Sequence, residues 1–423
     1  MGEDLTVISQ LAHTASWPAE IQDVPEDVQI SLQRLCHDFL DKAVTSKLMR
    51  VALRPPPKDT YFPHRTDTTQ FLYQYEPSHW WTSGFFPGSL WLLYERSLRV
   101  KLAFSSEDIL AQALNWQKGM EKEQYNRATH DLGFMILPSF YRHYKLFGSA
   151  ASKDIIINAA KSLASRWNEK VQCLRSWDTC HTRRLNLDNP STEFLVIIDN
   201  MMNLDLLFVC SELTGDPEFS RMATAHAHTT LKNHVRSDNS TYHLVNYDPR
   251  NGEVKGRYTV QGYDDQSCWS RGQAWALYGY ASVYKYTKDK TFLDAANNCT
   301  KYFCGRVGGS TDADGKSGAV YWDFDAPRPP AILDTSAAMI ACSGILLLYQ
   351  LTSDDQFLPW AKKILKHCLS HAVAPDSGDS VLSGATVNNN KDAIDRSSET
   401  GLVYADYYLI EAGNRLLEID PTA

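Results

Sequence analysis

Asp199 is the residue whose surroundings best suit chemistry. It follows the apolar run Phe194–Ile198 and precedes Asn200, so we expect it to be mostly buried. Burial disfavours the charged form of a carboxyl group and raises its pKa toward the range of a general acid. We expect Asn200 and Asn203 to satisfy its hydrogen bonds. Asp199 is therefore predicted to act as a general acid/base.

A second aspartate, Asp131, stands in the sequence His130-Asp-Leu-Gly-Phe, where Gly133 permits close approach of another group. Two carboxylates that face one cleft push their pKa values apart, which leaves one of them protonated near neutral pH. The competing explanation for Asp131, and also for Asp334 and Glu399, is capping of a helix N-terminus. The pair Asp131 and Asp199 predicts acid/base catalysis if both side chains reach one cavity.

The segment from Gln261 to Trp275 holds the densest cluster of polar and aromatic residues. Arg271 lies where a helix should begin and opposes the helix dipole there, which predicts a specific anionic partner. That partner is either Asp264 or Asp265 in a salt bridge, or a carboxylate of the substrate. Trp275 comes four residues later and shares the same helix face.

Aromatic residues also precede the first long apolar run, where Trp80 and Trp81 are followed by Gly84. This arrangement resembles a platform on which a sugar ring stacks, although core packing explains Trp80 equally well. His243 is an isolated histidine, for which a structural role is the ordinary interpretation. The sequence contains no serine nucleophile elbow, phosphate loop, dinucleotide fingerprint or metal-binding histidine motif. These absences predict acid/base chemistry with no metal and no cofactor.

Six similar segments recur along the chain, each a polar or small opening followed by a long apolar run. Their markers are 50, 68, 70, 65 and 65 residues apart, which leaves room for two helices per unit. The markers are Trp81, Asp131, Asp199, Trp269, Asp334 and Glu399. Amphipathic segments with helical periodicity lie between them, at 152–167, 217–235, 291–303 and 356–371. A helix that is apolar all round must be buried, and one with a single apolar stripe packs outside it.

Six such hairpins closing into a ring predict an all-α fold, the (α/α)6 toroid. An open solenoid is the alternative, but solenoids need polar caps at their ends. We expect residues 1–60 to form an N-terminal extension whose one helix, around 28–43, packs on the barrel. Residues 61–423 should form the catalytic barrel, with long loops at 305–325 and 381–398.

Composition restricts the partners and the location. The net charge of −8 argues against nucleic acid, whose phosphates require clustered basic residues. The sequence contains no run of about 20 apolar residues, so it predicts no membrane span. The nine cysteines lack paired spacings, and the N-terminus lacks the pattern of a secretory signal. We therefore expect a reduced, cytoplasmic protein without membrane or nucleic-acid partners, present as a monomer or weak homo-oligomer.

Taken together, the motifs resemble those of the unsaturated glucuronyl hydrolases of glycoside hydrolase family 88, over roughly residues 75–412. The longest of them runs from Gln261 to Trp275, and the others are Trp81-Thr-Ser-Gly-Phe-Phe-Pro-Gly, His130-Asp-Leu-Gly-Phe and Ile198-Asp-Asn-Met-Met-Asn. The resemblance implies the six-hairpin toroid and assigns roles by motif. It implies that Asp199 is the general acid/base and Asp131 the second essential aspartate. It also implies that the sugar site is lined by Trp81, His243, Gln261, Arg271 and Trp275.

The reaction implied by this resemblance is hydration of the C4=C5 vinyl ether of an unsaturated uronic acid at the end of a lyase-generated oligosaccharide. An unsaturated rhamnogalacturonyl hydrolase of the same fold is the first alternative. A toroid that only binds sugars or proteins is the second, and a conventional glycosidase acting on saturated sugars is the third.

Overall fold

The helices form two concentric layers in the computed structural model, which describes residues 37–58, 60–309 and 318–420. The inner layer, in chain order, comprises α4 (Phe85–Ser97), the run α6 (Leu132–Ile136), η5 (Leu137–Tyr141) and α7 (Arg142–Phe147), the pair η6 (Ile198–Met202) and α9 (Asp205–Thr214), α11 (Ser270–Thr287), α13 (Thr335–Thr352) and α15 (Val403–Ile419). The outer layer comprises α3 (Thr45–Ala52), α5 (Ser106–Lys118), α8 (Ala150–Ala164), α10 (Pro217–His234), α12 (Lys290–Gly308) and α14 (Phe357–His371). A short 3-10 helix, η4 (Glu121–Tyr125), follows α5.

Apolar periodicity explains which helix lies in which layer. Every residue of α13 from Thr335 to Leu348 is buried, because its sides all face other helices. By length and composition α13 could cross a membrane, but 78% of its apolar window is buried inside the protein. By contrast, α14 buries Trp360 and Ile364 and exposes Lys366, as expected of an outer helix.

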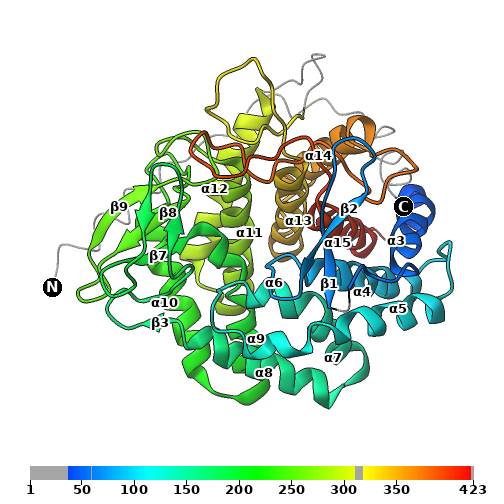
Figure 1. Cartoon of the computed structure of the whole chain (residues 1–423), viewed down its shortest axis with the longest axis horizontal. Coiled ribbons are helices and arrows are strands. Elements are labelled where there is room, and N and C mark those ends of the chain that lie inside the picture. Colours follow the sequence, from blue (N-terminus) through cyan, green and yellow to red (C-terminus); the bar gives the residue numbers. More distant parts are fainter. Residues whose placement is uncertain (1–36, 59, 310–317, 421–423) are drawn as a thin grey trace.

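Contacts between neighbouring inner helices close the ring. α11 packs against α13, α13 against α15, and α15 returns to α4, the first inner helix of the chain (Figure 1). The second inner helix is broken into α6, η5 and α7, and Pro138 lies in the π-helical turn η5. Proline removes a backbone donor and clashes with the preceding turn, which accounts for the irregularity. The predicted (α/α)6 toroid is the observed fold.

The N-terminal helix extends further than the sequence indicated. Its predicted range begins outside the described residues, and its predicted end at Ala43 is wrong, because η3 (Phe39–Val44) continues into α3. Lys47 Nζ then donates to three backbone carbonyls, those of Ala374, Pro375 and Ser380, at 2.7 to 3.0 Å. These bonds attach the N-terminal helix to the segment between α14 and α15. The division into an extension (1–60) and a catalytic domain (61–423) stays a prediction.

Short strands supplement the helices, and the sequence analysis did not predict them. β7 (Phe194–Ile197), β8 (Leu244–Tyr247) and β9 (Val254–Tyr258) form an antiparallel sheet in which Ile197 pairs with Leu244. All four residues of β7 are buried, so the strand shows no alternation of polar and apolar residues. The other strands form two-stranded pairs: β1 (Tyr61–Thr66) with β2 (Tyr73–Pro77), β3 (Trp167–Asn168) with β4 (Cys173–Leu174), and β5 (Cys180–His181) with β6 (Asn186–Leu187).

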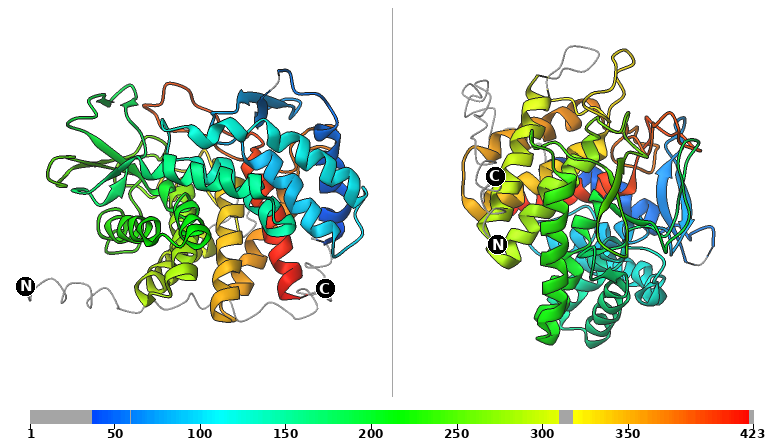
Figure 2. Two further views of the ribbon diagram at one scale, coloured as in Figure 1. Left: turned by 90° about the horizontal axis from the view of Figure 1, so that it is seen from below. Right: turned by 90° about the vertical axis from the view of Figure 1, so that its left-hand side faces the viewer.

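The strands and the long loop before α15 gather at the end of the barrel where α13 and α15 begin (Figure 2). The loop 381–398 is irregular as predicted, and bridges between Ala385 and Thr400 and between Asn388 and Ser397 fold it back on itself. The other predicted loop starts later than expected, because α12 continues to Gly308. One end of the toroid therefore carries the segments that can build a binding site.

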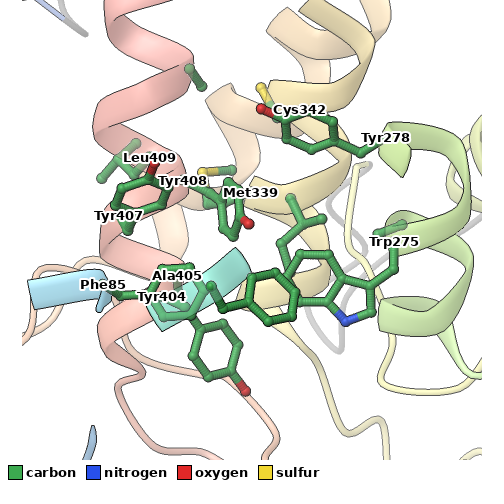
Figure 3. Packing of buried hydrophobic residues seen from close by; sticks show 14 of the residues in the cluster. Phe85, Trp275, Tyr278, Met339, Cys342, Tyr404, Ala405, Tyr407, Tyr408 and Leu409 are labelled. Atoms are coloured by element: carbon green, nitrogen blue, oxygen red, sulfur yellow. The ribbon is translucent and has the colours of Figure 1, made fainter. Parts of the chain in front are cut away.

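Buried aromatic rings pack together between the inner helices (Figure 3). The Phe85 ring lies 5.3 Å from that of Tyr407, and the Trp275 ring lies 5.6 Å from that of Tyr408. Phe134 joins them, with its centroid 5.1 Å from Trp275. The centre of the toroid is thus a packed core, and any site above it has an aromatic floor.

Candidate active site

Asp199 lies on η6, directly after strand β7, and is only 8% exposed. Burial raises the pKa of its carboxyl group to about 7, while the nearby Arg271 guanidinium opposes that shift. Within the described residues, its Oδ2 atom is buried and accepts no hydrogen bond. The predicted partners are wrong, because Asn200 Nδ2 donates to Leu174 O and Asn203 Oδ1 accepts from Phe134 N. The Asp199 carboxyl group can therefore be protonated near neutral pH, and one of its oxygens has no bonding partner in the described part of the chain.

His243, just before β8, is fixed as a neutral imidazole beside Asp199. Burial lowers its pKa to about 3. Its Nδ1 atom accepts the backbone N–H of Val260 at 3.3 Å, so the proton of the neutral ring sits on Nε2. Nε2 lies 3.8 Å from Asp199 Oδ2. The ring is held by Trp269 and Trp177, with centroids at 4.6 and 5.8 Å.

Asp131 lies at the N-cap position of α6, but its side chain makes no capping bond. Its Oδ2 accepts the Thr129 hydroxyl at 2.5 Å, and its Oδ1 lies 3.4 Å from His130 Nε2. Its negative charge adds to the effect of burial in raising the pKa of Asp199. The two predicted aspartates therefore face the same region, within electrostatic reach of each other.

Arg271 is buried and pairs with an aspartate that the sequence analysis did not assign to it. Its Nη1 donates to Asp334 Oδ2 at 2.7 Å, and its Nη2 donates to Gln261 Oε1 at 2.8 Å. The predicted salt bridge to Asp264 or Asp265 is wrong, since Asp265 is bonded instead to Arg184. The position of Arg271 at a helix start correctly predicted an anionic partner. That partner is Asp334, at the start of α13.

Aromatic side chains complete the site. Trp81 is partly exposed, and its ring lies 4.9 Å from that of the buried Tyr404. The Trp275 indole N–H is close enough to Asp199 to lower its pKa. Trp80 is 38% exposed and donates to His64 Nδ1, so it lies outside the core. The seven residues predicted from sequence thus lie near one another, around the buried carboxyl group of Asp199.

This arrangement can protonate a substrate and activate water, with aromatic faces for a sugar ring. In the described parts of the chain, no three His, Cys, Asp or Glu side chains gather as a metal site requires.

The sequence has named relatives with related activities. A protein from Formosa agariphila named unsaturated glucuronyl hydrolase is 39% identical over 346 residues, and the match covers 80% of each chain. The chain belongs to the unsaturated glucuronyl hydrolase family. A protein from Streptococcus pneumoniae named unsaturated chondroitin disaccharide hydrolase is 30% identical over 348 residues, covering 78% of this chain and 80% of that one. No family model matches the sequence.

Solved structures of unsaturated glucuronyl hydrolases share the fold. One described as specific for heparin is 32% identical, covers 92% of this chain and 98% of its own, and superposes with a TM-score of 0.77. The enzyme from Bacillus sp. GL1 is 27% identical, covers 92% of this chain and 97% of its own, and gives a TM-score of 0.76.

Three residues of this member of the unsaturated glucuronyl hydrolase family were missed or misjudged from sequence. Tyr404 was not singled out, although its buried hydroxyl lies near the charges of Arg271, Asp334 and Asp199. A tyrosine in the apolar opening of a helix looks like core, so no signal distinguished it. Asp334 was assigned only a capping role, which it fulfils by accepting the Ser336 N–H at 3.0 Å. Glu399 caps no helix, because α15 begins at Val403 after Leu402.

Proposed function

We propose that this protein is a hydrolase that removes an unsaturated uronic acid from the non-reducing end of lyase-generated oligosaccharides. The reaction is hydration of the C4=C5 vinyl ether, with Asp199 as general acid/base. The observation that carries this proposal is the buried Asp199 carboxyl group, whose pKa of about 7 lets it give and take a proton near neutral pH and whose Oδ2 has no hydrogen-bond partner among the described residues. A vinyl ether is an electron-rich alkene, and its protonation needs an acid of this kind.

In the proposed hydration, the carboxyl group of Asp199 carries out both proton transfers. Asp199 gives its proton to C4, and the positive charge that develops at C5 is shared with the ring oxygen. A water molecule then adds to C5 and returns one proton to Asp199, which restores the acid. The hemiketal so formed opens and releases the next sugar. Asp131 supports this cycle, because its negative charge disfavours ionisation of Asp199.

The rest of the site supports recognition of a sugar. Trp81 offers a partly exposed aromatic face. Gln261 accepts a bond from Arg271 through its carbonyl oxygen, so its amide N–H groups, which have no bond to the described residues, can donate to a substrate oxygen. His243 Nε2–H lies 3.8 Å from Asp199 Oδ2, where it can donate to a substrate hydroxyl or to the attacking water. Relatives are named for chondroitin disaccharides and for heparin, so we propose an unsaturated disaccharide from such an acidic polysaccharide as the substrate.

The chain is proposed to act in polysaccharide degradation in the cytoplasm, after a lyase has made the double bond. The eight cysteines of the described residues are free thiols, which suits a reducing compartment. We propose a monomer or weak homo-oligomer that binds neither nucleic acid nor membranes, in keeping with its net charge of −8.

Replacing Asp199 with Asn tests the assignment. Asn keeps the shape of the side chain but carries no acidic proton, so turnover of an unsaturated disaccharide should fall roughly 100- to 10,000-fold. Turnover is followed as loss of the ultraviolet absorbance of the double bond, and binding is followed by calorimetry and should persist. Asp205→Asn is a matched control, because Asp205 is a half-buried aspartate of raised pKa that accepts the Ser282 hydroxyl instead. Undiminished turnover by Asp199→Asn would refute the role of Asp199.

The same assay separates the alternatives. A rhamnogalacturonyl hydrolase would consume unsaturated rhamnogalacturonyl disaccharides faster than glucuronyl ones. A conventional glycosidase would cleave nitrophenyl glycosides of saturated sugars, and a binding protein would consume none of these substrates.

A further inference from the structure

Arg271 has almost no donor left for a ligand. Besides Asp334 and Gln261, its Nη1 donates to Thr386 O at 2.5 Å and its Nη2 donates to Val387 O at 2.7 Å. Each of these nitrogens carries two hydrogens, so all four are used. The guanidinium therefore cannot present its two-pronged face to a substrate carboxylate. It instead holds Gln261 and the loop 381–398 in fixed positions around itself.

Asp334 is built to receive this cation. It is fully buried, and its two oxygens have separate tasks. Oδ1 accepts the N–H and hydroxyl of Ser336 and the N–H of Thr386 at 3.0, 2.5 and 3.3 Å, while Oδ2 accepts Arg271 Nη1. Asp334 thus joins the start of α13 to α11 and to the same loop that Arg271 holds.

The charges around Asp199 show why a counter-ion is needed. Burial raises the pKa of Asp199, Arg271 lowers it, and Asp131 raises it. His243 on the strand side is neutral, and Tyr404 on α15 is kept protonated because burial raises its pKa. Arg271 is thus the positive charge that most opposes a protonated Asp199. Asp334 is the carboxylate bonded to it.

We propose that Asp334 is a positioning residue for the hydration reaction: it neutralises Arg271, which then fixes Gln261 and the loop 381–398 without drawing the proton from Asp199. This inference rests on the proposed function of the site. Asp334 caps α13 and has no bond to Asp199, so it would affect the reaction only through Arg271. Removing the charge of Asp334 should therefore change the pKa of Asp199. Loosening of the loop alone would leave that pKa unchanged.

The test is the pH profile of kcat/KM for Asp334→Asn with an unsaturated disaccharide. A general acid must be protonated in the free enzyme, so activity is present below its pKa and is lost above it. With Arg271 uncompensated, the carboxylate of Asp199 is stabilised, and the alkaline midpoint should move down by about one pH unit. At pH 7, near the wild-type midpoint, we expect kcat/KM to fall about fivefold, and by much less at pH 5.5.

Asp406→Asn is the matched control. Asp406 is also fully buried and holds the beginning of the same loop through the N–H groups of Val381 and Leu382, but it pairs with Tyr73 and lies near Lys47. Its replacement should reduce stability without moving the alkaline midpoint. If Asp334→Asn keeps the wild-type midpoint, or if both variants shift it equally, the proposal is overturned.

The double variant Arg271→Met/Asp334→Asn covers the case in which the single variant does not fold. It removes both charges, and replacing a buried ion pair with apolar groups is often tolerated. Its midpoint should lie at or above that of the wild type, and a lower midpoint would contradict the proposal. If the wild type consumes no unsaturated uronide at all, the proposed function fails instead, independently of Asp334.

Discussion

At the scale of single residues, the site depends on a carboxyl group placed where its charge is unfavourable. Asp199 is buried, and its neighbour His243 is neutral. Arg271, the nearby cation, is bonded to Asp334. Proteins retain such strained groups mainly where they function. The stability of the protein should therefore improve when this group is replaced.

Asp199→Asn should stabilise the fold at alkaline pH. The pKa of Asp199 is about 7 in the folded protein, because burial raises it above its ordinary value near 4. The folded state thus resists ionisation, and this cost is fully present above pH 7 and absent below about pH 4. We expect the variant to be more stable than the wild type by about 2–4 kcal/mol at pH 8.

The pH dependence of that difference is the control. Thermal or denaturant unfolding at pH 8 and pH 5 should show a large gain at the higher pH and a much smaller one at the lower. An equal gain at both values would mean that packing, and not the charge of Asp199, causes the effect.

The burial of Asp199 could be predicted from the sequence, but the partner of Arg271 could not. An apolar run on one side of Asp199 indicates burial directly, since the run is local. The partner of Arg271 lies 63 residues away on another helix. The position of Arg271 at a helix start indicates that it needs an anionic partner. Which carboxylate lies next to it depends on how the helices pack in the closed ring, and this cannot be read from the local sequence.

At the scale of elements, the site depends on how closely the start of α6 approaches η6. A Cβ on Gly133 would meet Asn203 Cα and Oδ1 at 2.7 Å, closer than van der Waals contact allows. Asn203 Oδ1 also accepts the N–H of Phe134 at 3.0 Å. The two segments that carry Asp131 and Asp199 are therefore docked directly against each other.

Gly133→Ala should disturb this docking. Because the obstacle includes backbone, the two segments must separate, and overpacking of this kind costs about 1–3 kcal/mol. We expect a lower midpoint of thermal unfolding together with reduced kcat, since Asp131 moves relative to Asp199. Gly305→Ala is the matched control: it lies in α12 with no atom within 4 Å of the added Cβ and should be neutral or slightly stabilising. Wild-type stability and kcat in Gly133→Ala would rule out tight docking.

Long periodic helices were predictable, and the short connections were not. The helices α10 and α14 match their predicted ranges to within a residue, because an apolar stripe of period 3.6 extends over four or more turns. Strands of two to six residues, such as β5 and β6, are too short to carry a periodic signal. The strand β7 is buried on both faces, so its sequence does not differ from that of a helix opening.

At the scale of the whole molecule, the ring places different polar groups at its two ends. The starts of the inner helices form the candidate active site. Toward their other ends lies a cavity of about 620 Å³, lined by residues that include Arg142, Glu411 and Arg415. There Glu411 lies 3.6 Å from Arg142 and accepts the hydroxyl of Tyr278 at 2.6 Å. Charges at that end are balanced by direct pairs, whereas near the active site several buried histidines are neutral.

Those histidines should make the fold sensitive to acid. Burial lowers the pKa of His226, His234 and His243 to about 3, 4 and 3. Between these values and the unfolded value near 6.5, the unfolded chain binds more protons than the folded protein, so stability rises with pH. Lowering the pH from 7 to 5 should therefore lower the free energy of unfolding. Below about pH 6.5 the loss should approach about 1.4 kcal/mol per pH unit for each histidine, with Asp199 offsetting one of the three. His226→Gln, which retains an acceptor for the Leu174 N–H, should reduce this slope by about one proton, whereas replacing the exposed His181 should not. A midpoint of unfolding that does not change between pH 7 and pH 5 would show that these rings are not held neutral by burial.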